Sequence, residues 1–262
     1  MFNLNKGLWS FIMERSAENM KDWQFVLITV GFAFIAMAAG YLLGSVNSAI
    51  IVSKAIYHED IRTHGSGNAG LTNMLRTYGM KAAGLTLIGD FLKTAISICI
   101  GGLLGGFGYI GGISVGGDCV LPLVYMAGFF SIIGHILPLY YEFKGGKGVL
   151  CTATMALILT PVIFLILLLI FIAMVAASKY VSLGSVSVAV LYPVAISGYM
   201  TASFGSGSLN GIVALVSILI AIIVVYCHRE NLKRISEGTE RKISIGGKKK
   251  SSDEKSDSKD RY

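Results

Sequence analysis

The stretch LCTATMALILTPVIFLILLLIFIAMVAA, residues 150–177, contains no charged side chain in 28 consecutive positions. A helix needs about 20 apolar residues to cross the hydrocarbon core of a membrane, which is about 30 Å thick. Similar runs occur at residues 25–56, 85–107, 120–140 and 211–227, with a weaker one at 183–204. The sequence therefore predicts an all-α, polytopic integral membrane protein.

The composition also points to a membrane protein. Of the 262 residues, 54% are hydrophobic and 14% are charged, and the mean hydropathy is +0.69, whereas soluble domains carry about 25% charge. Residues 228–262 hold 11 of the 22 Lys and Arg but 7 of the 15 Asp and Glu. Such a basic end suits an anionic membrane surface better than a nucleic acid. The four cysteines form no CxxC pair, so a zinc site is not expected. The motifs indicate no other metal and no organic cofactor.

Lys and Arg in the short loops predict the orientation, because loops rich in them stay on the cytoplasmic side. They occur in 57–83, in 141–148 and in the tail, whereas 108–119 has none. We therefore expect the first two segments and the C-terminus inside, and 108–119 and the N-terminus outside. This arrangement requires an odd number of crossings.

Splitting the longest run at Pro161 satisfies this requirement. It gives seven transmembrane helices, including a short, half-depth helix at 150–160 that is followed by a second at 162–177. A helix of that shorter length rises only about 16 Å, so it must be shielded by protein. The alternative leaves 183–204 outside the membrane and gives five crossings.

Three parts are expected along the chain. Residues 1–23 place apolar side chains opposite charged ones across a helical turn, which predicts a short helix in the membrane interface; a disordered extension is the alternative. Residues 24–243 form the membrane domain. Residues 244–262 combine a lysine run with mixed charges and are expected to be a disordered cytoplasmic tail.

The first of three polar clusters on the predicted cytoplasmic side is HGSGNAGLTN, residues 64–73, which Arg76 follows. Its glycines would let backbone N–H groups approach an anion, and four side chains add donors. The glycines are Gly65, Gly67 and Gly70, and the donors are Ser66, Asn68, Thr72 and Asn73. No strand precedes this G-x-G-x-x-G spelling, so a dinucleotide fold is rejected. A phosphate-binding loop is favoured over a flexible polar turn.

The second cluster is FKGGKGV, residues 143–149, at the start of an apolar helix. It combines the cations Lys144 and Lys147 with Gly145, Gly146 and Gly148. Cations beside glycines at a helix start again suit a phosphate. The alternative is a positively charged anchor with a turn.

The third cluster, HRENLKR at residues 228–234, begins where the last span ends. His228 and Asn231 are three residues apart, so they share one face of a helix. The alternative is a basic segment that only flanks the last span, but such a segment would need neither the histidine nor the asparagine. Asp90 and Lys93 have the same spacing inside a span, where a structural ion pair is expected, since ionised groups at membrane depth face the protein interior.

In these motifs the chain resembles the bacterial integral-membrane glycerol-3-phosphate acyltransferases that use acyl phosphate as the donor. The resemblance extends from residue 41 to residue 240. The matching stretches are 41–45, 60–62, 65–73 with Arg76, 90–93, 134–135 with Pro138, 143–149, and 228–234 with Gly238 and Glu240.

The resemblance implies a seven-helix acyltransferase domain over 24–243, in the bacterial plasma membrane, with its active site at the cytoplasmic face. It implies transfer of a fatty acyl group from acyl phosphate to the sn-1 hydroxyl of glycerol 3-phosphate, giving lysophosphatidic acid and phosphate. Membrane lipid surrounds such an enzyme, and the synthase that supplies the acyl phosphate would be a further partner. By resemblance, Ser66, Arg76, Lys147, His228 and Asn231 handle the substrates.

Both substrates carry phosphate, so we expect the 65–73 loop to hold the acyl-phosphate head. Glycerol 3-phosphate would be gripped by Arg76, Lys147, His228 and Asn231. The expected catalytic residues are Ser66, His228 and Asn231, and the expected binding residues are Gly65, Gly67, Asn68, Gly70, Thr72, Asn73, Arg76, Lys144, Gly145, Gly146, Lys147 and Gly148.

Two mechanistic alternatives stay open at this level. The hydroxyl proton could pass to His228 or to a substrate phosphate oxygen. A covalent acyl-enzyme is disfavoured because none of the three polar clusters contains a G-x-S-x-G nucleophile elbow. The rival function is a membrane transporter for an anionic, phosphorylated solute, which would also use broken helices.

Overall fold

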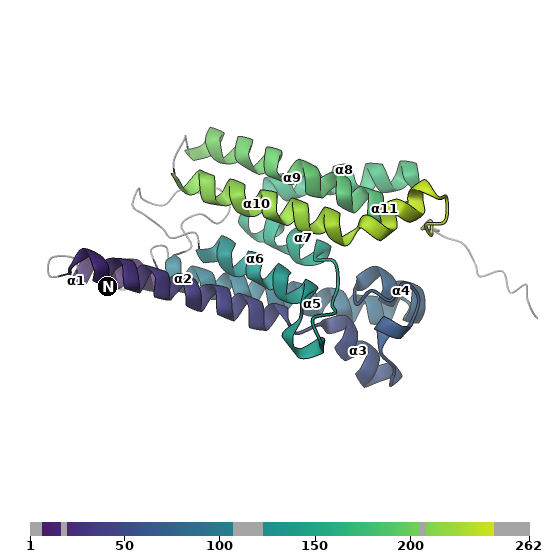
Figure 1. Cartoon of the computed structure of the whole chain (residues 1–262). Coiled ribbons are helices and arrows are strands. Elements are labelled where there is room, and N and C mark those ends of the chain that lie inside the picture. Colours follow the sequence, from purple (N-terminus) through teal and green to yellow (C-terminus); the bar gives the residue numbers. More distant parts are fainter. Residues whose placement is uncertain (1–6, 17–19, 107–122, 205–207, 244–262) are drawn as a thin grey trace, which may run out of the picture.

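The computed structural model describes residues 7–16, 20–106, 123–204 and 208–243, and every regular element in these ranges is a helix (Figure 1). The longer helices are α2 (Asp22–Gly44), α5 (Met80–Gly105), α6 (Leu123–Ile136), α8 (Pro161–Ser178), α9 (Val181–Phe204) and α10 (Ser208–Cys227). The shorter ones are α1 (Gly7–Ser16), α3 (Ser48–Tyr57), α4 (Leu71–Tyr78), α7 (Val149–Leu159) and α11 (Arg229–Ser236), with 3-10 turns η2 (Ile61–Thr63) and η4 (Leu139–Tyr141).

Several of these helices are membrane spans by length and composition. The described residues contain five helices long and apolar enough to cross a membrane, or six when the bent pair α10 and α11 counts as one span. Helix α9, which the five-crossing alternative treats as non-spanning, is among the five. The all-α membrane class is confirmed, whereas the count of seven crossings stays a prediction.

The predicted break in the longest apolar run is confirmed. Helix α7 ends at Leu159 and α8 begins at Pro161, with Thr160 between them. Proline is accepted at the first helical position because its missing N–H would have no partner there. The result is an apolar helix of 11 residues, too short to cross by itself.

The run at 25–56 contains a break that the hydropathy did not predict. It forms α2 and α3, separated at residues 45–47. The Asn47 side chain accepts a hydrogen bond from the Ile50 backbone N–H (3.1 Å) and so caps the start of α3. A buried Asn thus ends one helix and starts another inside an apolar stretch.

The helices form two layers. Helices α2, α5 and α6 pack against one another, and α8, α9 and α10 form the second layer, which is uppermost in Figure 1. Helix α7 contacts α5 and α6 as well as α8, so it joins the layers and is shielded by protein. Helices α3, α4 and α11 gather at one end of the bundle (Figure 1).

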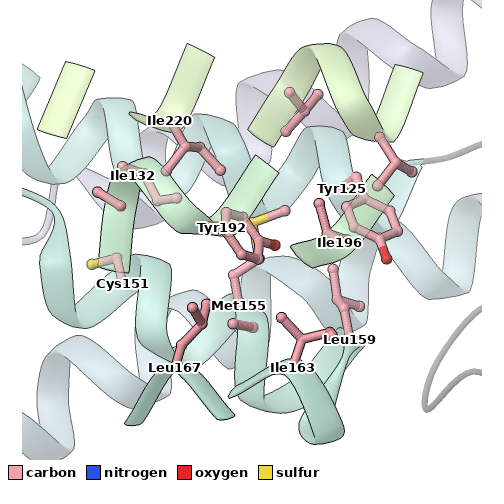
Figure 2. Close-up of a cluster of buried hydrophobic side chains, with 14 of the residues drawn as sticks. Tyr125, Ile132, Cys151, Met155, Leu159, Ile163, Leu167, Tyr192, Ile196 and Ile220 are labelled. Atoms are coloured by element: carbon pink, nitrogen blue, oxygen red, sulfur yellow. The ribbon is translucent and has the colours of Figure 1, made fainter. Parts of the chain in front are cut away.

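A single apolar core holds the layers together. Tyr192 and Ile196 from α9, Met155 from α7, Ile132 from α6 and Ile220 from α10 point toward one another and are almost fully buried (Figure 2). Side chains from α6, α7, α9 and α10 thus meet between the two layers.

Small residues let α2 and α6 approach closely. Gly40 and Gly44 on α2 face the backbone of Ala127 and Ser131 on α6, and Gly134 faces the backbone of α2 in return. In lipid, where apolar side chains gain little from leaving the solvent, such close backbone packing is a main source of helix association.

The N-terminal segment is helical over Gly7–Ser16, and this helix contacts α2 and α5. Trp9 is buried there, and its Nε1–H donates to Thr29 Oγ1 (3.0 Å). A position of α1 in the membrane interface stays a prediction. The predicted outer loop at 108–119 and the tail at 244–262 lie outside the described residues.

We predict that Gly44→Ala lowers the free energy of unfolding by about 1–3 kcal/mol, because its methyl group would overlap the Ser131 carbonyl. Gly31→Ala on the same helix is the matched control, since nothing lies within 4 Å of a Cβ at that position. Thermal unfolding in detergent measures both. Equal melting temperatures for the two variants would contradict the close packing of α2 and α6.

Candidate active site

The three polar clusters of the sequence meet at one end of the bundle. Helix α4 follows the first cluster, α7 follows the second, and α11 contains the third; α4 and α11 lie at the same end in Figure 1. The clusters are more than 60 residues apart in the chain, so their meeting is a result of the tertiary structure.

Asn73 organises the first loop. Its side chain is buried, its amide donates to the carbonyl oxygens of Ile61, His64 and Asn68 (3.3, 2.9 and 3.1 Å), and its Oδ1 accepts the Ser66 backbone N–H (3.1 Å). The polar atoms of Asn73, which was predicted as a substrate ligand, are therefore hydrogen-bonded to the backbone of the loop and its flank.

The loop leaves other groups accessible. Ser66 is exposed at its tip, Asn68 and Thr72 are half-buried, and Gly65 and Gly67 have φ of +62° and +72°. Residues with a side chain rarely adopt this left-handed backbone conformation, so the turn depends on the two glycines. Ser66 and Asn68 remain the candidate donors for an anion here.

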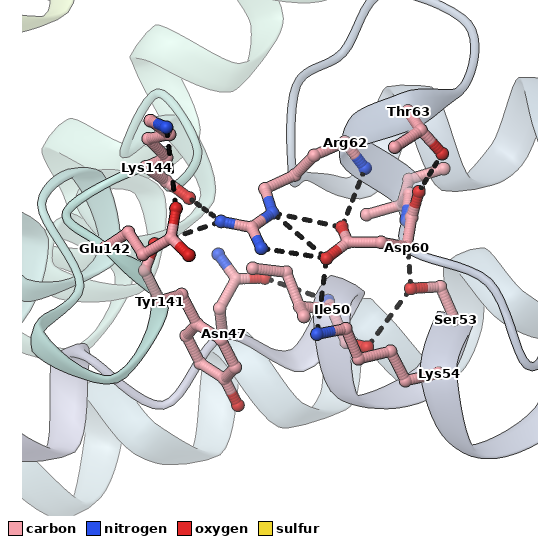
Figure 3. A network of polar contacts seen from close by, with 11 residues as sticks. Asn47, Ile50, Ser53, Lys54, Asp60, Arg62, Thr63, Tyr141, Glu142 and Lys144 are labelled. Atoms are coloured by element: carbon pink, nitrogen blue, oxygen red, sulfur yellow. Dashed lines mark hydrogen bonds and ion pairs between the residues drawn. The ribbon is translucent and has the colours of Figure 1, made fainter.

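Arg62 connects the first loop to the second (Figure 3). Its Nη2 lies 2.8 Å from Asp60 Oδ2, and its Nη1 donates to the Tyr141 carbonyl (3.0 Å). Hydrogen bonds from Arg62 hold the pKa of Asp60 well below its ordinary value. Asp60 is thus a fixed anion that orients the guanidinium, a role that sequence spacing did not indicate.

The glycines of the second loop act through close packing. The Gly145 and Gly146 N–H groups donate to the carbonyls of Ile136 and His135 (3.2 and 3.0 Å), and neither glycine has room for a side chain. Their N–H groups therefore complete the end of α6 and are not free for a phosphate. Gly148, at φ +77°, turns the chain into α7.

Of the two lysines in this loop, Lys147 contacts the third cluster. It donates to Asn231 Oδ1, whereas the Lys144 ammonium is exposed and lies 3.5 Å from Glu142 (Figure 3). Burial lowers the pKa of Lys147 to about 8.

Glu240 ties the third cluster together. Its Oε1 accepts from Asn231 Nδ2 (2.7 Å) and Ser182 Oγ (2.9 Å), and its Oε2 accepts from Arg234 Nε (2.8 Å). Burial alone would raise the pKa of Glu240, but these hydrogen bonds together hold it below its ordinary value. Glu240 and Ser182 were not among the predicted site residues. Glu240 lies among the stretches that match the family, which is the signal that could have found it.

Arg76 and His228 complete the cluster. Arg76 Nη2 donates to the Arg241 carbonyl (3.3 Å). The Arg76 guanidinium also interacts electrostatically with the charges of Lys147 and Glu240. His228 is buried, with Nδ1 2.8 Å from the Val224 carbonyl. Burial and the charge of Lys147 lower the pKa of His228 to about 4. The ring is therefore neutral near pH 7, with its proton on Nδ1 and its lone pair on Nε2.

A family model described as glycerol-3-phosphate acyltransferase matches residues 34–238. The chain belongs to the glycerol-3-phosphate acyltransferase family. Relatives of that name from Syntrophomonas wolfei and Clostridioides difficile are 40% and 39% identical, over 78% and 81% of this chain and 93% and 96% of theirs.

Solved structures of an acyltransferase of this family match the fold. PlsY (YgiH), an integral membrane glycerol 3-phosphate acyltransferase in its glycerol 3-phosphate form, has a TM-score of 0.66 and 28% identity, covering 81% of this chain and 96% of that one. Its lysophosphatidic acid form has a TM-score of 0.64 at the same identity, covering 81% and 95%. The rival transporter function finds no support in these matches.

We predict that Glu240→Gln destabilises this acyltransferase by about 1–3 kcal/mol near pH 7, because Asn231, Ser182 and the partly exposed Arg234 lose a buried, charged acceptor. The pKa of Glu240 is depressed below 4.5, so its stabilisation is complete above that pH and is lost as the pH falls through the folded-state value. The difference between wild type and variant should therefore shrink in acid.

Glu237→Gln is the control, since Glu237 is exposed and its carboxylate lies 4.0 Å from Lys233, and surface changes shift stability by about 0.5 kcal/mol or less. Thermal unfolding over a pH series measures both variants. A Glu240→Gln protein as stable as Glu237→Gln at neutral pH would contradict the role given to Glu240.

Proposed function

We propose that this chain transfers a fatty acyl group from acyl phosphate to the sn-1 hydroxyl of glycerol 3-phosphate, producing lysophosphatidic acid and inorganic phosphate. The names of the relatives support the reaction class. The observation that carries the proposal is the position of a cluster of cations and amides beside an apolar cavity. Such a pairing suits two phosphorylated substrates of which one has a fatty chain.

The cavity has a volume of about 160 Å³ and lies between α7, α8, α9 and α10. Its lining is almost wholly apolar and includes Val149, Phe164, Leu168 and Tyr192. Val149 comes two residues after Lys147, and Val224, also in the lining, is the residue whose carbonyl contacts His228. An acyl chain in this cavity would therefore have its carboxyl end beside the polar cluster.

The polar residues divide between the two substrates. We assign the acyl-phosphate head to the 65–73 loop with Ser66 and Asn68, and the phosphate of glycerol 3-phosphate to Arg76 and Lys147, with Asn231 alongside. Arginine and lysine bind phosphate through charge-assisted hydrogen bonds. Gly145, Gly146 and Gly148 serve by placing Lys147, and Lys144 lies outside this arrangement.

The reaction needs positioning more than chemical activation. The sn-1 oxygen attacks the acyl carbon, the bond from that carbon to the phosphate oxygen breaks, and the phosphate leaves with the electron pair. Fixed cations stabilise the charge that develops. We infer that a phosphate oxygen, with a second pKa of about 6, takes the hydroxyl proton. His228, with a pKa of about 4, is the weaker base and offers Nε2 as an acceptor that orients the hydroxyl.

The proposed location rests on the positions of Lys and Arg and on the organisms of the relatives. Arg62, Arg76 and Lys147 lie in the segments that connect the long helices at the site end of the bundle, and the positive-inside rule then makes that end cytoplasmic. The relatives come from bacteria, so we infer the bacterial inner membrane with an outer N-terminus and seven crossings. A site at the cytoplasmic face would also accept acyl phosphate from a synthase located there.

We predict that the purified protein forms lysophosphatidic acid from acyl phosphate and labelled glycerol 3-phosphate without any gradient. Arg76→Ala and Lys147→Ala should each lower kcat/KM by about 10- to 100-fold, because a charge-assisted hydrogen bond contributes about 1.5–3 kcal/mol. Lys233→Ala is the control, since its side chain is exposed on α11, and should retain full activity. Gradient-driven uptake into vesicles without lipid product would favour transport instead.

We predict a bell-shaped pH profile for kcat/KM. The alkaline limb should fall through about pH 8, where Lys147 loses its proton. Lys147→Arg should move this limb above about pH 10, because arginine stays protonated there. The acid limb should follow the substrate phosphate at about pH 6 and persist in His228→Gln. An acid limb that disappears in His228→Gln would assign the proton transfer to His228.

A further inference from the structure

A buried charged cluster next to the two loops consists of side chains that were not predicted as site residues. Lys93 and Asp90 on α5 and His135 on α6 are 5%, 1% and 4% exposed. The Lys93 ammonium lies 2.9 Å from Asp90 Oδ1 and 3.0 Å from His135 Nδ1. The ion pair expected from the sequence is therefore present, and a histidine joins it.

Lys93 reaches the support of the first loop. Its ammonium donates to the Val46 carbonyl (2.8 Å), in the break between α2 and α3. The next residue, Asn47, caps α3 and donates its Nδ2 to the Ala69 carbonyl (3.3 Å) in the first loop. One ammonium thus fixes the segment from which the 65–73 loop is held.

His135 supports the second loop. Its carbonyl accepts the Gly146 N–H (3.0 Å), and its ring lies so close to Gly146 that a methyl group there would overlap Nε2. The same glycine faces Ala69, because a Cβ at Gly146 would lie 2.8 Å from that carbonyl. The orientation of the His135 ring therefore sets where Gly146, and Lys147 after it, stand relative to the first loop.

We propose that Lys93 and His135 are positioning residues that fix the spacing between the 65–73 loop and Lys147, with Asp90 as the counter-ion. The proposal rests on the proposed acyl transfer, in which these two segments hold the two reactants. Reacting atoms must meet at about 3–3.5 Å, and a misplacement of about 1 Å can cost about 100-fold in rate. An ion pair that served stability alone could be replaced by uncharged side chains at little cost.

The test replaces the pair without burying an unpaired ion. Asp90→Asn/Lys93→Met should lower kcat by about tenfold or more, while the KM for glycerol 3-phosphate changes less than about threefold, because Arg76, Lys147 and Asn231 are retained. Thr94→Val is the matched control. Thr94 is a buried neighbour on α5 whose Oγ1 contacts Ser131 Oγ (3.2 Å), so its loss should lower the melting temperature and leave kcat within about twofold.

A second variant leaves the ion pair intact. In His135→Asn the side-chain oxygen can still accept from Lys93, but the ring edge against Gly146 is removed, and kcat should again fall by about tenfold. Normal kcat in a folded Asp90→Asn/Lys93→Met protein, or in His135→Asn, would overturn the proposal. If neither variant folds, the cluster serves folding alone and the proposal is also rejected. An inactive wild type would instead refute the proposed acyl transfer.

Discussion

One buried carboxylate organises the polar site. Glu240 accepts hydrogen bonds from Asn231, Ser182 and Arg234, and Asn231 in turn accepts from Lys147. A site for two phosphates must keep several cations close together, although like charges repel one another. A fixed anion offsets part of that repulsion and orients the amide that receives Lys147, while the cluster keeps a net positive charge for its ligands.

Four glycines have the same use in two parts of the molecule. Gly40 and Gly44 bring α2 against α6, and Gly145 and Gly146 bring the second loop against the end of α6. Each removes a Cβ where two backbones approach too closely for one. The close approach of two backbones thus sets both the packing of α2 against α6 and the position of Lys147. The site is thereby held against the helix bundle.

The architecture matches a reaction in which the donor is already activated. Helix α7 is only 11 residues long, and an apolar cavity lies between it and α8, α9 and α10, beside the loop that carries Lys147. Cations at one end of the cavity and apolar side chains along it can hold an amphiphilic molecule, with its reactive carbon where the polar and apolar parts meet. Burial lowers the pKa of His228 to about 4 and so keeps a neutral acceptor among cations, where a protonated imidazole would add to their repulsion.

The sequence by itself determined the membrane class, the break at Pro161 and the family, because long apolar runs, proline and short motifs act locally and need no knowledge of distant contacts. It also predicted Arg76, Lys147, His228 and Asn231 as site residues. The tertiary structure decided which polar atoms are free. Asn73 and the N–H groups of Gly145 and Gly146 are used up inside the fold, and Lys144 points away.

The break at Asn47 and the roles of Asp60, Arg62, Ser182 and Glu240 also needed the fold. Hydropathy averages over a run and does not register one capping asparagine. A hydrogen bond between residues 58 positions apart, such as that from Ser182 to Glu240, leaves no periodic trace in the sequence. Local chemistry can be read along the chain, whereas partners brought together by packing become visible only when the helices are placed in space.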